Sequence, residues 1–329
     1  PPQAELNGHC DVGDLWGVTA APSDERSCPC VATCGDDATL RLWDVQHHTM
    51  LHLTKLPAPG KSVEFSPAGN GHLAVGLKDG QVLVFDADEG QITELKDERG
   101  EVLRPRACFD DVFVVRYSPD NRFLAAGSHD DCVHIYDCGS DYRYMGRCLG
   151  HMSFIRSMDW SEESDYLMTS SGDNELLYWE MATLKQSLHA HTELRDSKWQ
   201  TWTSPLGWSV RGVWGKSDEP SEIKTVRRSP DGSLLALGDE LGNLKFYPFP
   251  CTRPEMTGTL QPAAHASMIT NLCFLKPDGG DLLLFSTSSE DQMMCQWHLH
   301  NMPERVEEEE DHMAMLREED SVAVTGWDA

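Results

Sequence analysis

An acidic residue followed six positions later by an aromatic residue recurs along most of this chain. The pairs are Asp37/Trp43, Asp79/Phe85, Asp130/Tyr136, Asp173/Trp179, Glu240/Phe246 and Asp291/Trp297. Most successive aromatic residues are separated by roughly 40–50 residues, which is close to the length of one four-stranded propeller blade. Because a repeat of this kind cannot bury its apolar face alone, the repeats must stack around a ring.

This pattern predicts an all-β fold, a WD40 β-propeller with six readable repeats. The interval between Trp179 and Phe246 is longer than the others and contains an insert at 195–214, RDSKWQTWTSPLGWSVRGVW. A turn sequence at 204–207 lies between two β-prone segments, which predicts a hairpin. We therefore expect seven blades, one of them irregular and containing the insert, with six blades as the alternative. An N-terminal strand at about residues 3–8 should pair with the last blade and close the ring.

The recurring histidines, acids and aromatics have a structural explanation. In a WD40 blade, a buried His, a strand Ser or Thr, the Trp and the turn Asp share one chain of hydrogen bonds between sheets. A catalytic role for the histidines would need a recognisable site, and the sequence shows none. We assign this structural role to His9, Asp37, Trp43, Asp79, Asp130, His151, Asp173, Trp179, His265, Asp291 and Trp297.

Four of the ten tryptophans lie in the insert, at Trp199, Trp202, Trp208 and Trp214. Packing of the insert into an irregular blade is the simpler explanation, because Trp is highly buried on average. An aromatic patch that binds a partner is the alternative. These four residues are the candidate partner-binding residues.

The charge balance restricts the partners. The chain has a formal net charge of −27. Nucleic acids and anionic lipid surfaces both require Lys/Arg patches, so we expect neither to be a partner. No apolar run approaches the roughly 18 residues of a membrane span.

We find no sequence motif for catalysis, cofactor binding or metal binding. There is no Gly-rich phosphate loop, no G-x-S-x-G elbow and no H-E-x-x-H pair. Cys28, Cys30 and Cys34 with His47 and His48 nearby do not have the spacing of a zinc site. We expect a chain that is not an enzyme and has no cofactor. Residues 1–302 are assigned to one ring, and 303–329 to an acidic C-terminal tail that includes RVEEEEDHMAMLREED.

Several stretches resemble one family, the echinoderm microtubule-associated protein-like family. They are GHCDVGDLWGVTAAP (8–22), GHMSFIRSMDWSEESDYLMTSSGDNELLYWE (150–180), LRDSKWQTWTSPLGWSVRGVW (194–214) and LALGDELGNLKFYPFPC (235–251). The chain is similar to the second, C-terminal propeller of the tandem propeller domain in that family, and the Trp-rich insert makes the match specific.

The resemblance implies a non-catalytic scaffold of a microtubule-associated protein, cytoplasmic and linked to the cytoskeleton, including the mitotic spindle. Its expected partners are tubulin, microtubule-associated proteins and other proteins. The alternative is a WD40 adaptor or substrate receptor unrelated to tubulin, because loops on the faces of the ring decide the partner.

Overall fold

The structure is a computed structural model of the 329-residue chain. It describes residues 4–7, 13–22, 29–87, 91–94, 110–195, 197–214, 222–253, 256, 258–277 and 280–299. Two of the sequence predictions lie outside these residues: the structural role of His9 and the acidic tail at 303–329.

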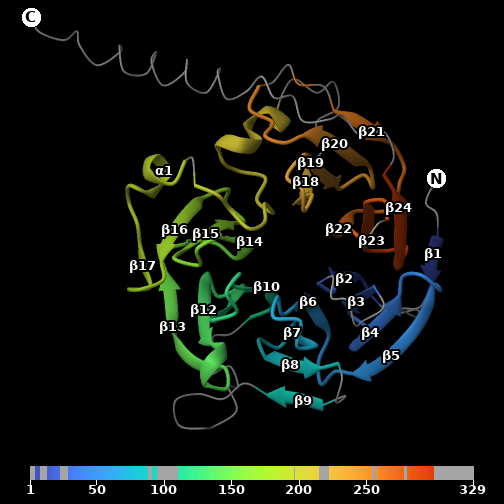
Figure 1. Cartoon of the computed structure of the whole chain (residues 1–329), viewed down its shortest axis with the longest axis horizontal. Helices are drawn as coiled ribbons and strands as arrows, with labels where there is room; N and C mark the ends of the chain where they lie inside the picture. Colours follow the sequence, from blue (N-terminus) through green and yellow to red (C-terminus); the bar gives the residue numbers. More distant parts are fainter. Residues whose placement is uncertain are drawn as a thin grey trace, which may run out of the picture.

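The described strands form six four-stranded antiparallel sheets, arranged as blades around a ring (Figure 1). Blade one contains β2 (Leu15–Ala20), β3 (Cys30–Gly35), β4 (Thr39–Asp44) and β5 (Thr49–Lys55). Blade two contains β6 (Gly60–Phe65), β7 (His72–Leu77), β8 (Val82–Asp86) and β9 (Gln91–Glu94). Blade three contains β10 (Val112–Tyr117), β11 (Phe123–Ser128), β12 (Cys132–Asp137) and β13 (Arg143–Leu149).

The remaining blades follow in the same order, with one exception in blade six. Blade four contains β14 (Ile155–Trp160), β15 (Tyr166–Ser171), β16 (Leu176–Glu180) and β17 (Lys185–Gln186). Blade five contains β18 (Ile223–Arg228), β19 (Leu234–Asp239), β20 (Leu244–Pro248) and β21 (Thr259–Gln261). Blade six contains β22 (Ile269–Leu275), β23 (Leu283–Ser288), β24 (Met293–His298) and the N-terminal strand β1 (Ala4–Asn7). Three short helices complete the described elements: η1 (Cys138–Ser140), α1 (Ala190–Glu193) and η2 (Trp208–Trp214).

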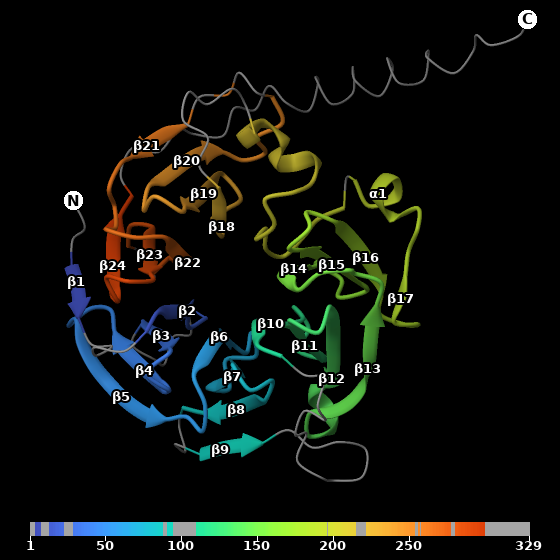
Figure 2. The same ribbon diagram turned by 180° about the vertical axis from the view of Figure 1, so that it is seen from behind.

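The ring is closed by strand β1, as the sequence predicts. Ala4 pairs with Gln296 and Asn7 with Met293, in antiparallel register. Strand β1 lies beside β24 on the outside of blade six in both face-on views (Figures 1 and 2). This pairing covers the edge of β24, which would otherwise present unpaired backbone groups.

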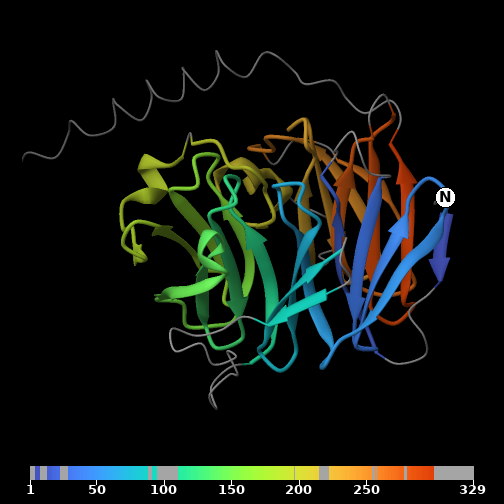
Figure 3. The ribbon, with the colours of Figure 1, turned by 60° about the horizontal axis from the view of Figure 1, so that its bottom comes forward.

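Burial explains why these segments form blades. The second strand of each blade is buried over nearly its whole length, and β19 and β23 are buried throughout. Apolar clusters join neighbouring blades, as where Val31 of blade one packs in the same cluster as Phe285 of blade six. In the tilted view of Figure 3, the outer strand β5 runs along the outside of the ring. Its residues are mostly exposed. Each blade thus buries its faces only by stacking on its neighbours.

The insert at 195–214 differs from the prediction. Its described residues form no hairpin and no further blade: Trp199 makes one isolated bridge with Ser161, and Trp208–Trp214 is the 3-10 helix η2. The described sheets therefore number six, which was the alternative. Tertiary packing overrides β propensity here. Val210 is fully buried, and a Cβ at Gly212 would lie 2.8 Å from the carbonyl oxygen of Cys251, so the segment is pressed against the chain that follows β20.

No described helix is long and apolar enough to cross a membrane.

Candidate functional site

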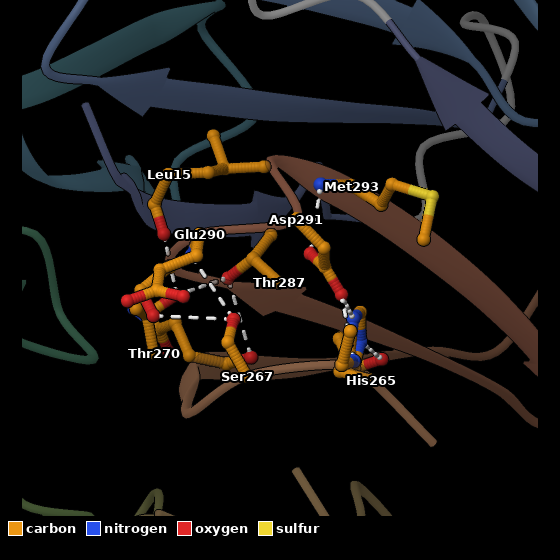
Figure 4. Close-up of polar contacts among 12 residues, drawn as sticks. Leu15, His265, Ser267, Thr270, Thr287, Glu290, Asp291 and Met293 are labelled. Atoms are coloured by element: carbon orange, nitrogen blue, oxygen red, sulfur yellow. Dashed lines mark hydrogen bonds and ion pairs between the residues drawn. The ribbon is translucent and has the colours of Figure 1, made fainter. Parts of the chain in front are cut away.

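Blade six contains the complete hydrogen-bond chain that the sequence predicts. The Ser286 hydroxyl accepts a bond from Trp297 Nε1 at 2.8 Å and lies 2.7 Å from His265 Nε2. His265 Nδ1 lies 3.0 Å from Asp291 Oδ2, and the Met293 N–H donates to the same carboxylate at 3.1 Å (Figure 4). Burial by itself would raise the pKa of Asp291, but these hydrogen bonds outweigh it and lower the pKa. This chain of hydrogen bonds fixes the turn before β24.

Blade four has a variant of this chain. Thr169 accepts from Trp179 Nε1 at 2.8 Å and lies 2.7 Å from His151 Nε2. Asp173 accepts from Ser171 rather than from the histidine. Burial lowers the pKa of His151, which favours the neutral imidazole despite the nearby carboxylate of Glu175. The histidine therefore acts as a buried structural residue.

Blade one has the Trp and hydroxyl without a described histidine. Trp43 Nε1 donates to Thr33 Oγ1 at 2.8 Å. The turn acid Asp37 is held by Arg41, with a distance of 2.9 Å between Arg41 Nη2 and Asp37 Oδ2. An arginine thus supports the turn acid here, as the histidine does in blade six.

Blade three replaces the Trp with Tyr136 and recruits a different histidine. His134 Nε2 lies 3.1 Å from Asp130 Oδ2, inside the same blade. Burial opposes ionisation of Asp130, but the His134 contact outweighs it and lowers the pKa of this carboxyl.

The turn acids of blades two and five make local contacts. Asp79 Oδ1 accepts from the Gln81 N–H at 3.2 Å. In blade five the turn acid is Asp239 and not Glu240, because Asp239 Oδ1 accepts from Asn243 N at 2.8 Å and Leu241 N at 3.0 Å.

Five further residues of these contacts were not predicted from the sequence: Thr33, Thr169, Ser286, Arg41 and His134. The hydroxyl residues had a detectable signal, since each lies ten or eleven positions before its Trp partner. Arg41 and His134 each follow the turn acid by four positions. All of these groups are satisfied within blades, so they explain the fold and not a reaction. Among the described residues no group of three or more His, Cys, Asp or Glu side chains could hold a metal ion.

The four insert tryptophans do not form one surface. Trp199 and Trp202 are 4% and 5% exposed and pack with Met168 of blade four and Leu235 of blade five. The backbone around them bonds to both blades: Gln200 N donates to Trp160 O at 2.9 Å and Arg228 N to Trp202 O at 3.1 Å. The described residues 197–214 run between these two blades in both face-on views (Figures 1 and 2). Trp199 and Trp202 are therefore core residues that join two blades.

The other two tryptophans lie on helix η2. In a 3-10 helix, side chains three positions apart share one face, so Trp208, Arg211 and Trp214 are aligned. We call these three residues the η2 face. Trp214 is 51% exposed, and its Nε1 donates to Pro205 O at 2.8 Å. The Arg195 and Arg211 guanidinium carbons lie 3.9 and 4.5 Å from the centre of the Trp208 ring. This face combines an exposed, fixed aromatic ring with the Arg211 cation, and Arg195 adds a second cation at Trp208.

Six stacked four-stranded blades, an N-terminal strand that closes the ring and the shared Trp–hydroxyl–His contacts define a WD40-type β-propeller. The family model for the echinoderm microtubule-associated protein second beta-propeller matches residues 15–299. The chain therefore belongs to the echinoderm microtubule-associated protein family, as the resemblance implied.

Curated relatives agree with this assignment. The chain is 36% identical over 295 residues to rat echinoderm microtubule-associated protein-like 1, covering 89% of this chain and 34% of the relative. It is 34% identical to human echinoderm microtubule-associated protein-like 2, covering 89% of this chain and 42% of the relative. The chain thus spans between a third and a half of the length of these relatives.

One solved structure shows the fold alone. A chain in the crystal structure of the mitotic checkpoint complex superposes with a TM-score of 0.66 at 15% identity, covering 91% of this chain and 92% of that one.

Proposed function

We propose that this propeller is a non-catalytic protein-interaction scaffold of a microtubule-associated protein, and that it contacts tubulin or spindle partner proteins through the η2 face. The family and the curated relatives, whose printed names call them microtubule-associated, support the general role. The observation that carries the specific proposal is Trp214, a half-exposed indole whose Nε1 is already bonded to the Pro205 carbonyl.

A fixed aromatic ring is well suited to act as an anchor. Tryptophan and arginine are enriched among the residues that dominate binding energy in protein interfaces. A ring that is already held in one orientation loses little conformational entropy on binding. Trp199 and Trp202 support this surface from the core and do not contact a partner in this arrangement.

Charge favours a local contact over long-range attraction. A chain with a net charge of −27 is repelled at a distance by an acidic partner such as tubulin. The guanidinium groups of Arg195 and Arg211 at Trp208 offer a cationic patch on that background. Complementary charge within the contact area then sets orientation and selectivity. We place the protein in the cytoplasm, on microtubule arrays and the mitotic spindle, on the basis of the family.

The direct test is to measure binding of the purified chain to soluble tubulin and, separately, to assembled microtubules, at low and physiological salt. The proposal predicts binding to soluble tubulin that persists at physiological salt, because the contact is local and partly apolar. Absence of binding to both forms would contradict the tubulin contact and favour the alternative of a WD40 adaptor or substrate receptor unrelated to tubulin.

A further inference from the structure

All six inner strands carry a β-bulge near their start. The backbone register shifts after the first residue of β2, β6, β10, β14, β18 and β22. A bulge leaves one residue out of the ladder and re-aims its side chain. The residues in these positions are Trp16, Lys61, Phe113, Arg156, Lys224 and Thr270. All of them line one cavity of about 250 Å³ between the inner strands, which we call the channel cavity.

The lining of the channel cavity is basic. It includes five cationic side chains and one acidic side chain, Glu222. The cationic residues are Lys61, Arg116, Arg156, Lys224 and Arg227. In the whole chain, by contrast, acidic residues outnumber Lys and Arg by 54 to 27. The fold therefore gathers a minority of positive charges in the centre of an acidic ring.

Some of these cations are neutralised by carboxylates of the same blade or of a neighbouring blade. Lys61 Nζ lies 2.8 Å from Asp36 Oδ1, and Lys224 Nζ lies 2.7 Å from Glu222 Oε2. Arg116 Nη1 lies 2.7 Å from Glu64 Oε2. Arg156 Nη2 also lies 3.8 Å from Glu222 Oε1, so four of the five cations have a carboxylate partner, and Glu222 is shared by two of them.

Arg116 and Arg227 differ from the other lining cations. Arg227 forms no ion pair within the described part of the chain, and the Nε atom of Arg116 is buried without a hydrogen-bond partner there. Burial lowers the pKa of Arg116 and the positive charge of Arg227 adds to this, whereas the carboxylates of Glu64 and Asp159 oppose it. Two guanidinium groups that line one cavity favour an anion between them, because the anion offsets their repulsion and can accept from the unpartnered Nε of Arg116.

The rim of the channel cavity has the opposite charge. Asp14 and Asp111 directly precede β2 and β10. Burial raises the pKa of Asp14, and the charge of Asp36 raises it further. Burial also raises the pKa of Asp111. A ligand with many carboxylates would be repelled at this rim. A ligand that carries one compact anionic group and is otherwise uncharged would not be repelled in this way.

Aromatic rings also line the channel cavity. The Phe113 ring lies 6.2 Å from Trp16 and 5.8 Å from Phe154, measured between ring centroids. These rings offer an apolar contact for the group that carries the anion.

We propose that the channel cavity binds a single phosphate group, held by Arg116 and Arg227 with Arg156 and Lys224 beside them. Guanidinium groups match phosphate oxygens in bidentate geometry and pair with a dianion better than ammonium groups do. The remainder of the ligand is uncharged and contacts Trp16 and Phe113. The phosphate is carried by a small molecule or by a phosphorylated serine of a peptide, and the experiment separates these sources.

The test is isothermal titration calorimetry of the full chain in phosphate-free buffer with three probes. The probes are inorganic phosphate, the capped peptide Leu-phosphoserine-Leu and a capped hexaglutamate. Binding of either phosphate probe, with hexaglutamate inactive, supports the proposal. If inorganic phosphate binds with the same affinity as the peptide, the ligand is a small molecule. If the peptide binds more tightly, the ligand is a phosphorylated side chain. Absence of binding by both phosphate probes at millimolar concentration overturns the proposal.

Variants locate the site. Arg227→Gln should weaken phosphate binding by about tenfold or more, because a hydrogen-bonded charge is lost from the site. Arg227→Lys keeps the charge without the planar fork and should have a smaller effect, which also covers the case in which the glutamine variant fails to fold. Arg122→Gln is the matched control, because the Arg122 side chain is 58% exposed and lies outside the channel cavity. Equal affinity in wild type and Arg227→Gln would overturn the assignment. This test does not involve tubulin, so its outcome is independent of the proposed function.

Discussion

Replacing Ser286 by alanine should strongly destabilise the ring, although only one oxygen atom is removed. The hydroxyl of Ser286 accepts from Trp297 Nε1 at 2.8 Å and lies 2.7 Å from His265 Nε2. Ser286 is fully buried, and His265 is 3% exposed. After the substitution, water cannot reach the two ring nitrogens, and each is left without its partner.

The magnitude follows from the two lost partners. A buried polar group left unsatisfied costs about 1–3 kcal/mol. Two such groups, partly relieved by relaxation of His265 toward Asp291, give about 2–4 kcal/mol of lost stability.

Ser288 supplies a matched control on the same strand. Its side chain is also fully buried, but its hydroxyl has no hydrogen-bond partner among the described residues. Ser288→Ala removes the same atom without orphaning a partner, so stability should change by less than about 0.5 kcal/mol or increase.

The assay is urea denaturation of wild type, Ser286→Ala and Ser288→Ala, monitored by tryptophan fluorescence. The midpoints are compared between variants for which the unfolding free energy depends equally on urea concentration. The reasoning predicts a clearly lower midpoint for Ser286→Ala alone. If the two alanine variants unfold at the same midpoint, the hydroxyl of Ser286 does not stabilise the blade in the way argued here.

Three further predictions concern other parts of the ring. The pKa of Asp291 is lowered from its usual 3.8, because hydrogen bonds from His265 and Met293 outweigh burial; the folded state therefore binds this proton less readily than the unfolded state. Its stabilisation should be fully present above pH 3.8 and should disappear as the pH falls below 3.8 and through the lower pKa of the folded state. Asp291→Asn should flatten the acid limb of a stability profile measured by urea denaturation, and a limb as steep as that of wild type would refute this. Trp202→Ala should cost about 3–5 kcal/mol, because it leaves a cavity between blades four and five, whereas the exposed Trp214→Ala should change stability by less than about 1 kcal/mol in the same assay. Deletion of residues 1–7 removes the strand that pairs with β24, so size-exclusion chromatography should show self-association through the uncovered edge, and a monomeric, equally stable product would contradict this role.

The sequence predicts the ring well, because its signal is repeated and local. The spacing from turn acid to aromatic places Asp37/Trp43, Asp173/Trp179 and Asp291/Trp297 in equivalent turns and strands, and the closure by β1 follows from the need to cover an edge. The insert was predicted wrongly as a hairpin. Trp and Val have high β propensity, but the burial of Val210 against a distant segment favours a 3-10 helix over a strand.

The surfaces were less predictable from sequence than the ring. The alignment of Trp208, Arg211 and Trp214 depends on that same helix. The η2 face therefore could not be predicted from a hairpin. The basic lining of the channel cavity combines residues from distant inner strands, and no local pattern predicts that Arg116 and Arg227 line the same cavity. Local repetition thus predicts the scaffold, and long-range packing creates the candidate binding surfaces.

In the proposed function, the η2 face carries the contact with tubulin. The most direct measurement is the affinity of wild type, Trp214→Ala and Met152→Ala for soluble tubulin at physiological salt. Met152 is the control, because it is an apolar side chain 87% exposed outside the η2 face. The account predicts that Trp214→Ala weakens binding by about tenfold or more, as expected for an interface anchor, while Met152→Ala binds like wild type. Tubulin binding that is unchanged by Trp214→Ala would contradict the account.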